Sequence, residues 1–174
     1  MAKKSKNKIN IILNSIALIF AVVSICMIFT EVCGINIDGE LGYVLTGLQA
    51  TFGYSKQTAV LGSTVTTTYT MFSFMNLLTY ILLVAGVVVM LLRMFKVLKS
   101  SAVEYLAAIM FIVAGVLYFV LPNFVIYGNG WADLVELAIK ADGIKTTLIG
   151  GIIGGVSAVL AGAMVLAKKF VTKK

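Results

Sequence analysis

Histidine is absent from this 174-residue chain, which has one proline, one tryptophan and two cysteines. Without histidine the chain lacks the commonest metal ligand and the commonest general base at neutral pH. If both were helical, Cys26 and Cys33 would lie about 10 Å apart along the axis, which is too far for a disulfide, so we expect two free thiols. No nucleophile–base pair and no metal-ligand cluster can be assembled from what remains. We therefore expect a protein that is not an enzyme and that carries no metal or other cofactor.

Long apolar runs dominate a composition that is 60% hydrophobic and 12% charged. Four segments, at 9–29, 72–92, 105–121 and 148–167, are apolar and carry no charge in their middle. A bilayer core of about 30 Å needs roughly 20 apolar residues in helical form. The pattern predicts an all-α membrane protein: one membrane domain over residues 1–174, built on a four-helix transmembrane bundle, with outer loops at 30–71 and 122–147.

Basic residues are distributed unevenly about these segments, although the net charge is +7. Only Lys56, Lys140 and Lys145 fall in the two long loops. Such a bias predicts that both termini and the middle link are cytoplasmic in the plasma membrane. It also indicates that the basic tails contact the lipid bilayer, and not nucleic acid. The other eleven basic residues lie in the tails and the middle link: Lys3, Lys4, Lys6, Lys8, Arg93, Lys96, Lys99, Lys168, Lys169, Lys173 and Lys174.

The two outer loops have different patterns. Residues 64–70 are β-branched or aromatic, and glycine-containing stretches at 39–42 and 53–56 are typical of turns. We expect two to four short strands here, forming a small extracellular antiparallel β-sheet. In the second loop, 132–140 alternates apolar and charged residues at helical spacing, which predicts a short amphipathic helix.

Two sets of residues are candidates for contacts. Small residues recur along the fourth apolar segment and allow close helix packing, either inside the bundle or between subunits. Aromatic and apolar residues in the outer loops are candidates for contacts with other proteins. The small residues are Gly150, Gly151, Gly154, Gly155, Ala158 and Gly162, and the outer-loop residues are Leu48, Phe52, Val65, Tyr69, Tyr127 and Trp131.

Polar residues also mark the predicted cytoplasmic ends of the segments. Asn10 and Asn14 lie one helical turn apart, which favours contacts with head groups or a hydrogen bond between helices. Glu104 opens the third segment, where an acid favours the helix dipole. We expect it to pair with Lys96 or Lys99 and to have a structural role.

The order of segments, with a long strand-rich first outer loop and a shorter second loop, resembles the claudin-type tetraspan layout. Gly47-Leu48 matches a fragment of the claudin signature, whose two tryptophans and paired loop cysteines have no counterpart here. The resemblance implies a first loop that adds strands to a small sheet, and subunits that assemble side by side or across membranes. No functional residue is carried over from that family.

Our leading hypothesis is a structural or interaction protein that forms a homo-oligomer through its outer loops and its small-residue helix faces. The first alternative is a pore or channel subunit, in which the oligomer encloses a path. The second alternative is an accessory subunit that binds another membrane protein.

Overall fold

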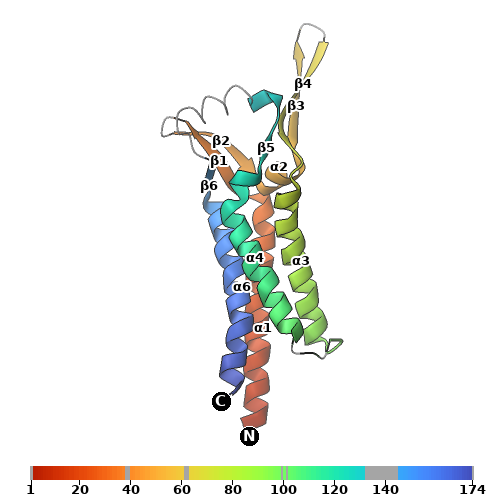
Figure 1. Ribbon diagram of the computed structural model, residues 1–174, viewed down its shortest axis with the longest axis vertical. Coiled ribbons are helices and arrows are strands. Elements are labelled where there is room, and N and C mark those ends of the chain that lie inside the picture. Colours follow the sequence, from red (N-terminus) through yellow and green to blue (C-terminus); the bar gives the residue numbers. More distant parts are fainter. Residues whose placement is uncertain are drawn as a thin grey trace. The chain divides into compact units, whose positions relative to one another are not determined.

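The computed structural model describes residues 2–37, 40–60, 63–98, 100, 102–131 and 145–173. Within these ranges four helices are long and apolar enough to cross a membrane (Figure 1). This result is compatible with a multi-pass membrane protein and confirms the four predicted apolar helices. They are α1 (Ala2–Cys26), α3 (Phe74–Met94), α4 (Ala102–Val120) and α6 (Ile149–Lys173).

The helix ends differ from the predicted limits by several residues. Helix α1 extends into the basic N-terminal segment and is followed by a short 3₁₀ helix, η1 (Met27–Phe29). Helix α4 ends before Pro122, which lies in a 3₁₀ helix, η2 (Leu121–Phe124). Proline lacks the N–H that would continue the helical ladder, so the predicted stop is found there.

The chain divides into two compact units. The first comprises Met1–Cys26, Leu78–Tyr118 and Ile153–Lys174, and the second comprises Met27–Leu77 and Phe119–Ile152. We call the first the helical unit, because it consists of helices, and the second the strand unit, because it contains the strands.

Close contact between α4 and α6 characterises the helical unit. A Cβ atom added at Gly154 would lie 2.7 Å from the Tyr118 ring, and one at Gly162 would lie 2.9 Å from the Ala108 carbonyl oxygen. Only glycine permits such an approach. The Tyr118 hydroxyl donates to the Ser24 carbonyl (2.7 Å), and the Ser24 hydroxyl donates to the Gly154 carbonyl (2.8 Å). These bonds tie α1, α4 and α6 together where the surroundings are apolar.

The second unit contains two three-stranded antiparallel sheets. One has the order β2-β1-β6 and the other β3-β4-β5. Each sheet combines two strands from the first loop with one short strand from the second. The strands are β1 (Glu31–Ile37), β2 (Glu40–Thr46), β3 (Tyr54–Val60), β4 (Ser63–Met71), β5 (Ile126–Tyr127) and β6 (Lys145–Thr147).

The structure corrects three details of the predicted loops. The strands form two sheets where one was expected, because β2 and β3 are separated by a helix. Residues 40–42 begin β2, and residues 54–56 begin β3, so the turns predicted at 39–42 and 53–56 are wrong for those residues. The predicted amphipathic helix at 132–140 lies outside the described residues.

The connecting helix, α2 (Gly47–Phe52), is held at both ends. Thr46 and Gln49 form a capping box, with each side chain accepting the other residue's backbone N–H. At the other end the Gln49 carbonyl accepts from the Thr70 hydroxyl (2.8 Å), and the Ala50 carbonyl accepts from Asn76 Nδ2 (2.9 Å). Asn76 is completely buried, so its amide serves as an internal cap for this short helix.

Gly154→Val should destabilise the helical unit, because the added side chain would overlap the Tyr118 ring. Overpacking of this kind costs about 1–3 kcal/mol of the free energy of unfolding. Ala163→Val is the matched control, since Ala163 is an exposed small residue on the same helix. The midpoint of thermal unfolding in detergent should fall for Gly154→Val alone. Equal midpoints for the two variants would contradict the packing described.

Candidate functional site

Open strand edges are the first feature of the strand unit that can bind another chain. Among the described residues, β2 is paired only with β1, and β3 only with β4. Each open edge presents backbone N–H and C=O groups that a further strand can pair with. Charged residues usually protect such edges, but β2 carries only Glu40 at its start, and β3 carries only Lys56.

A hollow of about 290 Å³ lies beside these two strands. We call it the tyrosine hollow, because three tyrosines line it. The rings of Tyr54 and Tyr69 are stacked, with centroids 5.6 Å apart. Tyrosine offers a broad apolar face and a polar tip, which suits contacts with other proteins. The lining consists of Tyr43, Val44, Leu45, Gln49, Tyr54, Lys56 and Tyr69.

The predicted outer-loop residues occupy several elements. Leu48 and Phe52 are exposed on α2, and Val65 is exposed on β4. Tyr69 lines the tyrosine hollow. Trp131 ends a short 3₁₀ helix, η3 (Asn129–Trp131), and its side chain is outside what the structure describes. Tyr43 and Tyr54 were not predicted as contact residues, because they join Tyr69 only after the strands fold.

Tyr127 lies beside a cation and near a buried thiol. Lys145 Nζ lies 5.1 Å from the centroid of the Tyr127 ring, a cation–π contact between β6 and β5. Burial, and to a lesser extent the nearby Cys33, raise the pKa of Tyr127 above its usual value. Cys33 is on β1, where burial raises the pKa of its thiol to about 12. Both cysteines are free thiols, as predicted.

The small residues of α6 contact other parts of the same chain. Gly154 and Gly162 lie against α4, as does Gly155, whose carbonyl oxygen would lie 2.9 Å from a Cβ atom at Gly115. Gly150 lies against Thr30 and Glu31, and Gly151 against Thr147 and Val32. Ala158 is completely buried.

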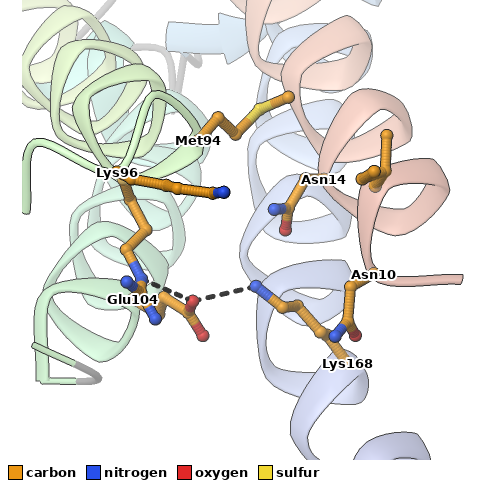
Figure 2. Close-up of a pocket in the computed structure, with 8 residues that line it drawn as sticks. Asn10, Asn14, Met94, Lys96, Glu104 and Lys168 are labelled. Atoms are coloured by element: carbon orange, nitrogen blue, oxygen red, sulfur yellow. Dashed lines mark hydrogen bonds and ion pairs between the residues drawn. The ribbon is translucent and has the colours of Figure 1, made fainter. Parts of the chain in front are cut away.

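An ionic cluster links three helices of the helical unit. Oε1 of Glu104 on α4 accepts from Arg93 Nε on α3 and from Lys168 Nζ on α6, each at 2.9 Å (Figure 2). The expected partners were Lys96 and Lys99. Lys96 makes no ion pair with a described residue, and Lys99 lies outside the described part of the chain. Lys168 was missed because it is 64 residues further along the chain.

The same residues line a pocket of about 190 Å³ between the helices. In Figure 2, Lys96 and Asn14 extend toward one another from opposite sides of this pocket. We call it the cationic pocket, because three of its side chains are basic and one is acidic. Its lining is Asn10, Ile11, Asn14, Arg93, Met94, Lys96, Glu104 and Lys168.

Comparisons with protein-family models, curated proteins and solved structures found no match to this chain. Within the described ranges, no three His, Cys, Asp or Glu side chains are grouped so that they could hold a metal ion. The strand edges and the tyrosine hollow offer strand pairing and aromatic contact, and the cationic pocket, described above, offers ionic attraction.

Glu104→Gln should weaken the helical unit, because it leaves Arg93 and Lys168 close together without the carboxylate between them. Removing one member of a buried ion pair costs about 3–5 kcal/mol. Arg93 is partly exposed, so we expect up to about 3 kcal/mol here. Glu31→Gln removes an exposed acid and is the control. Chemical unfolding in detergent should separate the two variants, and unchanged stability of Glu104→Gln would refute a structural role for the cluster.

Cys33 should react slowly with alkylating agents in the folded protein. Its folded pKa of about 12 lies above the ordinary value of 9.0, so the unfolded chain releases this proton first. The contribution of this group to stability is therefore lost as the pH rises from about 9 to about 12. In a Cys26→Ser variant at pH 8, alkylation measured by mass spectrometry should be at least about a hundredfold slower than in the unfolded chain. Similar rates in both states would show that the thiol is accessible.

Proposed function

We propose that this chain is a structural protein of the plasma membrane, with cytoplasmic termini, that self-associates through its outer strands. The observation that carries the proposal is the pair of open edges on β2 and β3, which border one aromatic hollow. The bias of basic residues supports the orientation. The resemblance to the claudin-type layout leads to the same expectation, because there an outer sheet supplies contacts between subunits.

The apolar side chains on β2 and α2 favour a protein partner. Leu41, Tyr43 and Val44 on β2 are exposed, as are Leu48 and Phe52 on α2. Exposed aromatic and aliphatic side chains beside a pocket are typical of the centre of a protein interface. An edge strand that pairs with another chain gains backbone hydrogen bonds, and neighbouring pockets then hold its side chains.

A second copy of the chain is the occupant that we propose. Among the described strands each copy has open edges on β2 and β3, which are long, and on β5 and β6, which are short. The β2 edge of one copy can therefore pair with the β3 edge of the next. Such a head-to-tail contact produces a ring if the rotation closes, and an open chain if it does not. The side chains of the incoming strand would then enter the tyrosine hollow.

A lysine placed on either edge should block assembly. Val44→Lys on β2 and Thr58→Lys on β3 alter exposed positions, so the fold should be retained. A charge on a strand edge opposes pairing, and we expect association to weaken at least tenfold. Asn129→Lys adds the same charge at an exposed residue outside both edges and is the control.

The measurement is the mass of each purified protein in a mild, lipid-preserving detergent, by light scattering with the detergent subtracted. The unaltered chain and Asn129→Lys should form oligomers, of one size if the contact closes a ring and of mixed size if it does not, and the two edge variants should be monomers. A monomeric unaltered chain, or edge variants with the full oligomer mass, would reject the proposal.

A further inference from the structure

The cationic pocket has a positive charge that the ionic cluster does not neutralise. Arg93, Lys96 and Lys168 each contribute one positive charge, and Glu104 is the one acid in the lining. The formal charge of the lining is therefore +2. One carboxylate balances only one of the three positive charges, so the pocket keeps a net positive charge that favours an anionic ligand.

Lys96 makes the fewest polar contacts of the three cations, counted over the described residues. Its exposed side chain has no acidic partner among the described residues, and it extends into the pocket (Figure 2). Its backbone has a φ of 62°, in the left-handed region that residues other than glycine rarely adopt. Arg93 is more committed, since Nε bonds Glu104 and Nη1 donates to the Leu98 carbonyl at 3.0 Å. Arginine has five N–H donors, so others remain for a ligand.

Two amide side chains face the same space. Asn10 and Asn14 line the pocket from α1, one helical turn apart. Oδ1 of Asn10 is buried and has no hydrogen-bond partner within the described residues. An amide also carries two N–H donors, so these residues can donate to the oxygen atoms of a ligand. Oδ1 is an acceptor, so its partner would be a water or a hydroxyl group of a ligand, and the amide N–H groups would donate to phosphate oxygens.

The pocket lies where all four candidate spans have one of their ends. Asn10 is one residue inside the first span, and Arg93 is one residue from the end of the second. Glu104 is in the first turn of the third span, and Lys168 ends the fourth. In a bilayer these positions are at the level of the lipid head groups. Ile11 and Met94 add apolar lining, and Ile11 is 60% exposed, as suits contact with acyl chains.

We propose that the cationic pocket binds the phosphate group of an anionic lipid. Lysine, arginine and amide donors provide the charge and hydrogen bonds that phosphate oxygens accept. Basic pockets between transmembrane helices on the cytoplasmic side are suited to such head groups. A soluble phosphate ester has the same chemistry, but it lacks the acyl chains that Ile11 and the neighbouring apolar surface can contact. The proposal does not depend on self-association.

The test is native mass spectrometry of the full chain with phosphatidylglycerol or with phosphatidylcholine, a zwitterionic lipid, at equal concentrations. Lys96→Gln removes one charge from the pocket without touching the ionic cluster. Lys56→Gln removes one charge from β3, outside the pocket, and is the matched control. One basic residue near a membrane surface contributes about fivefold to the binding of anionic lipid. Lys96→Gln should therefore bind phosphatidylglycerol about fivefold more weakly than the unaltered chain, and Lys56→Gln should bind it equally well.

Three outcomes would overturn the proposal. The first is equal binding of phosphatidylglycerol and phosphatidylcholine by the unaltered chain. The second is equal loss in the two lysine variants, which would show a general effect of charge. The third is displacement of phosphatidylglycerol by millimolar glycerol phosphate, which would assign the pocket to a soluble phosphate ester. Unchanged thermal unfolding of Lys96→Gln should accompany the expected result, because its side chain supports no described contact.

Discussion

The strand unit depends on how the carbonyl groups at the end of α2 are satisfied. A helix of six residues is too short to be stable alone, and its last carbonyls have no partners within the helix. Here the Gln49 carbonyl accepts from the Gly53 N–H and from the Thr70 hydroxyl. The Ala50 carbonyl accepts from the Asn76 side chain, and the Thr51 carbonyl accepts from the Ser73 N–H at 2.8 Å. Strand β2 ends where α2 begins, and β3 begins just after it ends. Fixing α2 therefore fixes the neighbouring ends of the β2 and β3 edges.

Local sequence predicted the elements that depend on local properties. Length and apolar composition were enough for the four helices, and the β-branched run at 64–70 falls within β4. Pairing over long distances could not be predicted, since β6 joins β1 from more than 100 residues away. Helix α2 was missed although Thr46 and Gln49 have the spacing of a capping box. The apolar residues around them alternate much as they do in a strand, so the two signals conflicted.

The candidate sites were harder to predict than the fold, because their residues meet only after folding. Tyr43, Tyr54 and Tyr69 come from three strands, and nothing in their spacing indicates a shared hollow. The partners of Glu104 were predicted from nearness in the sequence, which favoured Lys96 and Lys99. Alternation of helix direction brings the end of α3, the start of α4 and the end of α6 together instead. This geometry selects Arg93 and Lys168.

The small residues of α6 already contact other parts of the same chain, and this limits which surface is left for the assembly that we propose. Close approach of a second helix needs an uncovered row of glycine and alanine. Along α6 that row is already used. Gly154 and Gly162 contact α4, and Gly150 and Gly151, which belong to the strand unit, contact other residues of that same unit. A second copy would have to displace these contacts in order to pack there. The open edges of β2 and β3 require no such displacement, because their backbone groups are unpaired among the described strands. For the self-association that we propose, pairing of these strands is therefore the route that disturbs the folded chain least.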